Sequence, residues 1–253
     1  MTPPRIIRAV ELGGPKPLFC VPLVAADSDQ LIDQASVARG LGSDLVEWRA
    51  DAYERVDAEA FVEAAYHLRS VLGDTPIIYT LRRASEGGAR LIDQDLRVRC
   101  MSAVLRTGVV DVIDVELSNG PEFVSPLVDL AHTNSTAVIL SLHDFEKTLT
   151  EAELMQSIAL MVENGADIAK LACMPRRRED VLTLFQVTLA ARQAFPRVPL
   201  CTISMGNLGA ISRVAGFLYG SDMTFAVGQQ VSAPGQIPLA EARTIADALL
   251  KYS

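Results

Sequence analysis

Residues 136–173 read TAVILSLHDFEKTLTEAELMQSIALMVENGADIAKLAC. Both ends of this stretch, 136–143 and 167–173, are short apolar runs of the kind that form buried strands. Between them, residues 150–163 have the length and pattern of a helix, and Gly165 follows as a stop signal. Near-continuous apolar strands separated by a helix are typical of a parallel sheet that is covered by helices.

The same alternation of strand and helix runs through the whole chain. Further helices are expected near 28–40, 57–72, 91–107, 121–133, 178–193, 208–217 and 239–251. Further strands are expected at 18–24, 44–49, 76–82, 111–117, 199–204 and 223–227. Eight strand-helix pairs suit a closed (β/α)₈ TIM barrel, which takes ~250 residues. We therefore expect one catalytic domain over residues 1–253.

Two details of the N-terminal part refine this expectation. Residues 5–12 (RIIRAVEL) are predicted to form a short hairpin that closes the barrel bottom.

The alternative architecture is an open, doubly wound sheet, which uses the same strand-helix units. It usually has fewer strands and often a glycine-rich nucleotide loop after the first strand. Here the first strand is followed by VAADSDQ (24–30), which has no glycine, so the barrel is favoured.

Composition excludes several classes of function. The net charge is −8 and no basic stripe is present, which argues against a nucleic-acid partner. No run reaches the ~18 apolar residues of a membrane helix, and the N-terminus lacks the apolar stretch of a signal peptide. The four cysteines lie far apart without a CxxC pair, as expected of reduced core residues. These features predict a cytoplasmic protein.

Ionisable residues interrupt five of the predicted strands, mostly near their C-terminal ends. Alternate side chains on a strand point the same way, and in a barrel these strand ends converge on the mouth, where active sites lie. We therefore expect a shared site in this region. Asp114 and Glu116 have a simpler explanation, because they can balance the arginines. The interrupting residues are Glu47, Arg49, Arg82, Asp114, Glu116, His143 and Lys170.

Lys170 is the most informative of these residues. A lysine inside the apolar run ADIAKLAC is costly unless it is neutral or paired. Burial and nearby cations would lower its pKa from ~10.4 and leave a neutral amine that can attack a carbonyl. The alternative is a structural ion pair with Glu47, Asp114 or Glu116. His143, with an ordinary pKa of ~6.5, suits proton transfer at neutral pH.

Two later segments carry binding signals. Gly206 and Gly209 precede Arg213 in GNLGAISRVAG, a loop that could accept an anion, and the planar guanidinium matches a carboxylate. Residues 231–238 (VSAPGQIP) follow the last strand and are rich in small residues. That composition fits a mobile lid over the barrel mouth, and it fits an ordinary loop equally well.

Taken together, these motifs resemble the type I 3-dehydroquinate dehydratase family. The similarity extends over most of the chain, with the motifs in family order and at family-like spacing. The combination is far more specific than any single motif. The matching stretches are EWRAD (47–51), TLRRASEGG (80–88), DVIDVEL (111–117), SLHDF (141–145), GADIAKLACMP (165–175), SMGNLGAISR (204–213), YGSDMTF (219–225) and SAPGQ (232–236).

The resemblance implies a (β/α)₈ homodimer that dehydrates 3-dehydroquinate to 3-dehydroshikimate in the shikimate pathway of aromatic amino-acid biosynthesis. It implies that Lys170 forms a Schiff base, that His143 is the general acid and base, and that Glu86 orients the histidine. No metal or organic cofactor is implied. Arg213 matches the arginine for the substrate carboxylate. The other matching substrate-binding positions are Glu47, Arg49, Arg82, Ser232, Gln236, Met205 and Phe225.

Some positions depart from the family pattern, and two other functions remain open. Pro22 replaces a serine and Leu142 a polar or aromatic residue of some relatives. Asn207 and Leu208 stand where others have charged residues. An imine-forming aldolase acting on a sugar phosphate is one alternative, with GNLG as its phosphate site. A non-catalytic barrel that binds a hydroxy-acid is the other. The residues do not distinguish a biosynthetic role from quinate catabolism.

Overall fold

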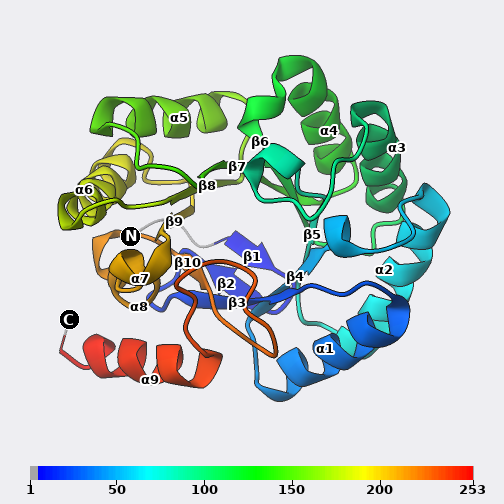
Figure 1. The fold of residues 1–253 in the computed structure, drawn as a ribbon, viewed down its shortest axis with the longest axis horizontal. Coiled ribbons are helices and arrows are strands. Elements are labelled where there is room, and N and C mark those ends of the chain that lie inside the picture. Colours follow the sequence, from blue (N-terminus) through cyan, green and yellow to red (C-terminus); the bar gives the residue numbers. More distant parts are fainter. Residues whose placement is uncertain (1–4, 253) are drawn as a thin grey trace.

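The computed structural model describes residues 5–252 and confirms the (β/α)₈ barrel (Figure 1). Neighbouring strands are parallel throughout, in the order β10-β3-β4-β5-β6-β7-β8-β9. The two outer strands come together where the Asp222 amide donates to the Leu200 carbonyl at 2.7 Å, so the barrel is nearly closed. The strands are β3 (Leu18–Leu23), β4 (Leu45–Arg49), β5 (Ile77–Thr80), β6 (Val112–Glu116), β7 (Ala137–Asp144), β8 (Ile168–Cys173), β9 (Leu200–Ser204) and β10 (Met223–Phe225).

Residues 5–252 form seven long helices, and Figure 1 shows that these helices surround the strands. Six of the helices start within one residue of the predicted position, and side-chain caps fix the first turn of several. Asp27 and Asp57 each accept a backbone amide of the helix that follows, and Thr150 and Glu153 form a capping box. The helices are α1 (Ser28–Gly40), α2 (Ala58–Leu72), α3 (Gln94–Leu105), α4 (Pro121–Thr133), α5 (Glu151–Glu163), α6 (Arg178–Ala194) and α9 (Leu239–Leu250).

The single helix predicted at 208–217 is wrong. The chain forms two short helices, α7 (Gly206–Gly209) and α8 (Ser212–Ala215), followed by the 3-10 turn η4 (Gly216–Tyr219). The reason is close packing on β9, since a Cβ atom on Gly209 would lie 2.1 Å from the Ser204 carbonyl oxygen. The Ser212 hydroxyl also binds this turn, at 2.7 Å from the Gly209 carbonyl.

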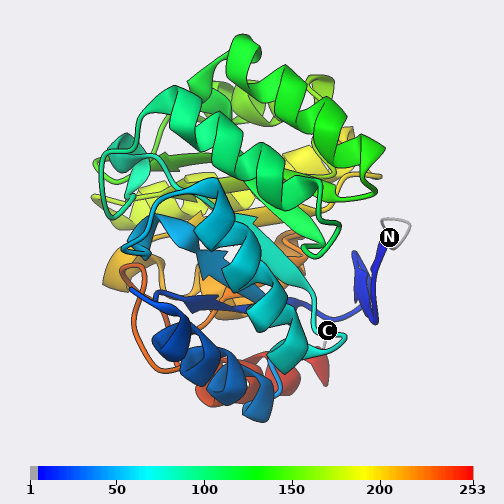
Figure 2. The same ribbon diagram turned by 90° about the vertical axis from the view of Figure 1, so that its right-hand side faces the viewer.

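The predicted N-terminal hairpin is confirmed. Strands β1 (Arg5–Ile7) and β2 (Val10–Leu12) pair antiparallel and lie at one end of the barrel, as Figure 2 shows. Leu12 is fully buried in the interior cluster. Ion pairs fix the hairpin to the barrel, with Arg5 at 2.5 Å from Asp167 and Arg8 at 2.5 Å from Asp111.

The strands bury both of their faces, as the sequence predicts for a parallel sheet. Ile168 and Ala172 point into the barrel, where they belong to the interior cluster. Ala169, Leu171 and Cys173 face the helices and belong to the outer cluster. Lys170 therefore lies on the inward face among apolar neighbours. The four cysteines are buried and unpaired, which confirms the expectation of reduced core thiols.

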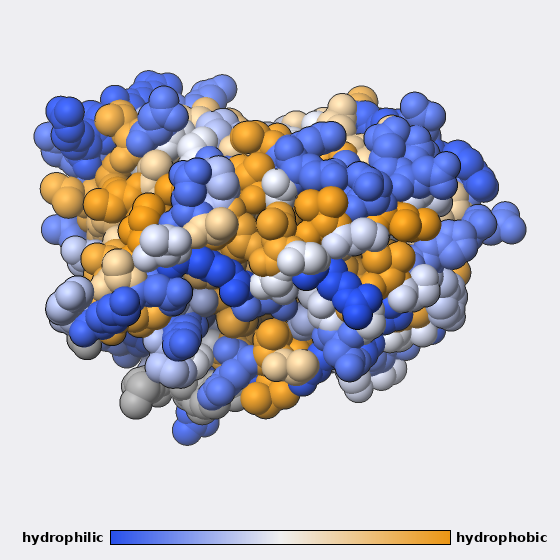
Figure 3. Space-filling model, turned by 90° about the horizontal axis from the view of Figure 1, so that it is seen from below, coloured by the Kyte–Doolittle hydropathy of each residue, from blue (hydrophilic) through white to orange (hydrophobic). Residues whose placement is uncertain are grey.

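The surface is mixed rather than uniformly polar. Figure 3 shows the side of the molecule on which α1 and α9 lie, where apolar residues gather across the middle and mix with polar residues toward the edges. Such exposure of apolar atoms is ordinary for a globular protein. Among residues 5–252, no helix is long and apolar enough to cross a membrane.

Candidate active site

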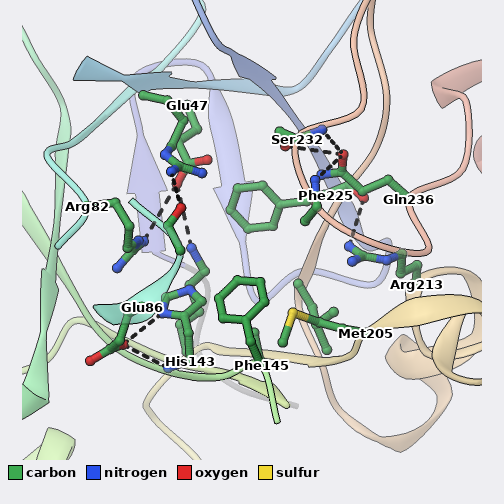
Figure 4. Close-up of a pocket in the computed structure, with 16 residues that line it drawn as sticks. Glu47, Arg82, Glu86, His143, Phe145, Met205, Arg213, Phe225, Ser232 and Gln236 are labelled. Atoms are coloured by element: carbon green, nitrogen blue, oxygen red, sulfur yellow. Dashed lines mark hydrogen bonds and ion pairs between the residues drawn. The ribbon is translucent and has the colours of Figure 1, made fainter. Parts of the chain in front are cut away.

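One pocket lies at the C-terminal ends of the barrel strands, and all eleven predicted site residues line it (Figure 4). This is the end at which barrel active sites form. The structure therefore brings together residues that are up to 189 positions apart, from Glu47 to Gln236. Five further residues complete the lining and were not among the predicted site residues: Gly87, Phe145, Ala172, Ile203 and Ala233.

Lys170 forms the floor of the pocket and is only 4% exposed. Its Nζ atom lies 2.8 Å from Oδ2 of Asp114, 3.6 Å from Oε1 of Glu47, and 4.4 Å from the centre of the Phe225 ring. Burial favours the neutral amine, but the two carboxylates outweigh it and raise the pKa of Lys170. The expectation of a lowered lysine pKa is therefore wrong, because the expected cations are outweighed by closer anions. The free protein carries an ammonium ion at this position.

A buried ionic network extends outward from this lysine. The Arg82 guanidinium lies 2.9 Å from Asp114 and 3.0 Å from Glu116, and Glu116 lies 2.7 Å from Arg97 of α3. Burial alone would raise the pKa of Asp114, but Arg82 and Lys170 hold it far below its usual range. Asp114 and Glu116 thus balance the buried cations, which is the simpler of the two explanations weighed for them.

His143 is paired with Glu86. The Oε2 atom of Glu86 lies 3.1 Å from Nδ1 of His143 and accepts the His143 backbone amide at 2.9 Å (Figure 4). Burial, together with the charges of Arg82 and Lys170, lowers the pKa of His143 well below 6.5. The imidazole is therefore neutral near pH 7. A proton on Nδ1 directed at Glu86 leaves Nε2 as the basic nitrogen.

The loop after β5 is held in place by Asp51, which the sequence analysis did not single out. Asp51 forms a two-pronged ion pair with Arg49, with both contacts at 2.8 Å, and accepts the Ala89 amide at 2.8 Å. The glycines of this loop are required sterically. A Cβ atom on Gly88 would lie 2.3 Å from the Arg82 carbonyl, and one on Gly87 would lie 2.5 Å from the Phe145 ring.

Arg213 is a buried cation with unused binding capacity. It is 3% exposed and donates to two carbonyls, that of Phe225 at 3.3 Å and that of Pro234 at 2.9 Å. Within residues 5–252, its Nε atom has no hydrogen-bond partner and its guanidinium has no carboxylate partner. Burial lowers its pKa to about 10, so it remains charged at neutral pH. A carboxylate in the pocket would supply both the hydrogen-bond acceptor for Nε and the negative charge for the guanidinium.

The loop that carries Ser232 and Gln236 lies against Arg213 (Figure 4). The side-chain carbonyl of Gln236 accepts the amide of Ser232 at 2.9 Å, which holds the turn together. The Gly206 amide donates to the Pro234 carbonyl at 3.1 Å. Gly235 has φ +76°, and a Cβ atom there would lie 2.2 Å from the Gly206 carbonyl oxygen. The loop and the turn after β9 are therefore in direct contact.

Arg213 is the lining cation that suits an anionic ligand. Arg49, Arg82 and Lys170 also line the pocket, but each of them is already paired, with Asp51 or Asp114. In the part of the chain that the structure describes, no three His, Cys, Asp or Glu side chains are grouped so that they could hold a metal ion. What the pocket offers is an amine, an imidazole and several donors for oxygen atoms.

Comparison with known proteins places this geometry in a family. The sequence model for type I 3-dehydroquinase matches residues 19–252. The 3-dehydroquinate dehydratase of Geobacillus thermodenitrificans is 40% identical over 249 residues, covering 98% of this chain and 96% of the relative. That of Aromatoleum aromaticum is 43% identical over 239 residues, covering 94% and 92%.

Solved structures agree with the sequence relatives. The crystal structure of 3-dehydroquinate dehydratase from Geobacillus kaustophilus superposes with a TM-score of 0.96 at 38% identity, over 99% of this chain and 97% of that one. That of the type I 3-dehydroquinate dehydratase from Clostridium difficile gives 0.96 at 35% identity, with both chains covered in full. From its sequence, its barrel and its relatives, the chain belongs to the type I 3-dehydroquinase family.

Proposed function

We propose that this protein removes water from 3-dehydroquinate to give 3-dehydroshikimate through an imine on Lys170. The observation that carries the proposal is the position of Lys170, which is buried at the floor of a pocket whose wall contains the unpaired cation Arg213. An amine at the base of an anion-binding pocket can capture a substrate that bears both a ketone and a carboxylate.

The charges around Lys170 favour the reactive form of the imine. The reaction removes a proton next to the ketone carbon, and the electrons released need an acceptor. A protonated imine is such an acceptor, because it carries a positive charge at nitrogen. Asp114 at 2.8 Å and Glu47 at 3.6 Å stabilise a positive charge at this nitrogen. The carboxylates that keep the free amine protonated therefore also keep the imine protonated.

The same pairing means that the amine must lose a proton before it attacks the ketone. His143 is the neutral base of the pocket, since its pKa is lowered well below 6.5 by burial. It accepts the proton from the amine and returns it to the hydroxyl of the carbinolamine, which leaves as water, so that the imine forms beside a neutral imidazole. His143 then removes the α-proton and passes it to the β-hydroxyl group, which departs as a second water. Glu86 holds the imidazole in the orientation that these transfers need. Hydrolysis of the imine releases the product.

The remaining residues orient the substrate. Arg213 binds the carboxylate through its unused Nε atom and an adjacent N–H group. Met205 and Phe225 form the apolar wall, 2% and 5% exposed. The alternative function, an aldolase acting on a sugar phosphate, needs a phosphate site at Gly206. The backbone amide of Gly206 already donates a hydrogen bond to the Pro234 carbonyl. The polar groups assigned to the substrate hydroxyls and carboxylate are Glu47, Arg49, Arg82, Ser232 and Gln236.

We also propose that the protein is a cytoplasmic homodimer of one catalytic domain, residues 1–253, with no nucleic-acid partner. The dimer rests on the resemblance to the family, the domain extent rests on the eight strand-helix pairs, and the net charge of −8 supports the absence of a nucleic-acid partner. Light scattering coupled to size-exclusion chromatography tests the dimer. A mass of twice 27.3 kDa is expected, and a mass of 27.3 kDa would contradict it.

The direct test of the reaction is incubation with 3-dehydroquinate while the absorbance of the conjugated enone product is followed. Absorbance should rise with the wild-type protein and stay flat with Lys170→Met, which removes the amine but keeps the length of the side chain. A flat trace for the wild type would refute the proposed reaction. Cleavage of a sugar phosphate in a parallel assay would support the aldolase instead.

A further inference from the structure

Ser118 lies on the solvent side of the Glu86–His143 pair. It belongs to the 3-10 turn η3 (Leu117–Asn119), which follows β6, and it is exposed. Its hydroxyl makes a short hydrogen bond to Oε1 of Glu86, the oxygen that His143 does not use. The turn is fixed by Asn119, whose side-chain amide donates to the backbone carbonyl of Glu116 at 2.9 Å and to its carboxylate at 2.8 Å.

A neighbouring arginine sets the direction of this hydrogen bond. Nη1 of Arg83 lies 3.0 Å from the Ser118 hydroxyl oxygen, and a guanidinium can only donate. The serine oxygen therefore accepts from Arg83, and its own proton points to Glu86. Glu86 in turn can accept the proton on Nδ1 of His143 at 3.1 Å. The chain of donors runs from Arg83 through Ser118 and Glu86 to the imidazole.

We infer that Ser118 is a positioning residue for the dehydration, keeping the Glu86 carboxylate ionised and turned toward His143. This inference rests on the proposed function and adds to it a residue that lies outside the pocket lining. A carboxylate that is 6% exposed needs donors on both oxygens to remain charged. One oxygen has the His143 amide, and Ser118 supplies the donor for the other.

Of the contacts that lower the pKa of Glu86 against the effect of burial, the hydrogen bond from Ser118 is the largest. Burial raises the pKa of Glu86, and the nearby Glu116 raises it further. The hydrogen bond from Ser118 opposes this rise, as do the charge of Arg82 and the amide of His143. The charged or titratable groups that face Glu86 and its partners are Arg82 and Arg83 after β5, Glu116 of β6, His143 of β7, and, around the imidazole, Arg49, Asp114 and Lys170.

Replacement of Ser118 should change the pH dependence more than the maximum rate. In Ser118→Ala the pKa of Glu86 rises further, so the carboxylate takes up a proton at a higher pH and His143 loses its charged partner. The acid side of the kcat profile should move upward by about 0.5–1 pH unit, while the rate on the plateau falls less. A purely structural loss would lower the rate equally at every pH.

Two variants serve as controls. Ser118→Thr keeps the hydroxyl and should restore the wild-type profile. Ser85→Ala removes an exposed serine next to Glu86 in the chain that does not line the pocket formed by residues 5–252, and its profile should equal that of the wild type. Because Ser118 is exposed, the folded state of Ser118→Ala should keep the circular dichroism spectrum and melting temperature of the wild type.

The closing experiment measures the protonation state of His143 by NMR and does not depend on turnover. The chain has three histidines, so protein labelled with ¹⁵N at histidine gives few imidazole signals, and His143→Ala assigns one set. The Nδ1–H tautomer of His143 should persist to a lower pH in the wild type and Ser118→Thr than in Ser118→Ala. Identical titrations and identical kcat profiles in Ser118→Ala and wild type would overturn the inference. If the wild type does not form the enone, the proposed dehydration is refuted but the role of Ser118 is not, because the histidine titration tests the Ser118–Glu86 contact independently of turnover.

Discussion

Nζ of Lys170 lies 2.8 Å from Oδ2 of Asp114, and the same carboxylate oxygen lies 2.9 Å from the guanidinium of Arg82. One buried carboxylate therefore serves two buried cations. It holds the lysine in the pocket, and it ties the lysine to an arginine of the same lining. The placement and charge of the lysine amine both depend on Asp114.

Asp114→Asn should destabilise the fold and slow the reaction. Removal of one partner from a buried ionic group leaves uncompensated charge, which typically costs about 3–5 kcal/mol. Urea unfolding should show this loss as a lower midpoint. The control is Asp129→Asn on the exposed face of α4, for which a change within about 0.5 kcal/mol is expected. Equal midpoints for the two variants would mean that Asp114 does not hold the network together.

His143→Ala should reduce turnover by about 10²–10⁴-fold, the usual contribution of a positioned acid or base. In the wild type, the rate should fall as the pH drops, because protonation of the imidazole removes the base. Since burial lowers the pKa of His143 below 6.5, this loss should begin below the ordinary histidine range. The measurement is kcat/KM across pH. Near-normal turnover in the variant would exclude His143 from the mechanism.

Arg213→Ala should chiefly weaken substrate binding. A buried carboxylate that loses its charged partner costs about 2–5 kcal/mol, so KM should rise tens-fold or more. Arg213→Lys should recover only part of the loss, because a point charge cannot make the two-pronged contact. Steady-state kinetics on both variants measure this. An unchanged KM in both would move the carboxylate site to Arg82 or Arg49.

The backbone amides of residues 228–238 should exchange hydrogen more slowly when substrate occupies the pocket. In the structure, Arg213 and Gly206 hold the loop by donating hydrogen bonds to the Pro234 carbonyl. A ligand bound to Arg213 therefore contacts a residue that holds the loop in place. Hydrogen exchange should slow in this loop on addition of substrate, and the gain should shrink in a Ser232→Ala, Gln236→Ala double variant. Equal exchange with and without substrate would identify the loop as a fixed wall.

Sequence patterns predicted the barrel well because its strands obey local rules. The predicted strand ends differ from the observed ones by at most two residues, as for 76–82 against Ile77–Thr80. Lys170 faces inward with Ile168 and Ala172 of the barrel interior, as the alternation of side chains along a strand requires. The broken helix after β9 was missed because its cause is a tertiary contact, between Gly209 and Ser204.

The chemistry of single residues was harder to predict. The direction of the pKa shift at Lys170 was wrong, and the alternative of an ion pair with Asp114, 56 positions away in the chain, is what the structure shows. Only the fold decides which charges lie nearest to the amine. Arg97 and Ser118 were missed for the same reason, since only the fold brings them to Glu116 and Glu86. Asp51 lies within the EWRAD motif, and a carboxylate two residues after a strand-end arginine was a usable signal.

Covalent trapping on Lys170 is the most direct test of the account. Borohydride added together with 3-dehydroquinate should reduce the imine, inactivate the protein and leave a stable adduct. Peptide mass spectrometry should place that adduct on Lys170 and on no other lysine, and Lys170→Met should remain unmodified. An adduct on another residue, or full activity after reduction in the presence of substrate, would contradict the imine mechanism.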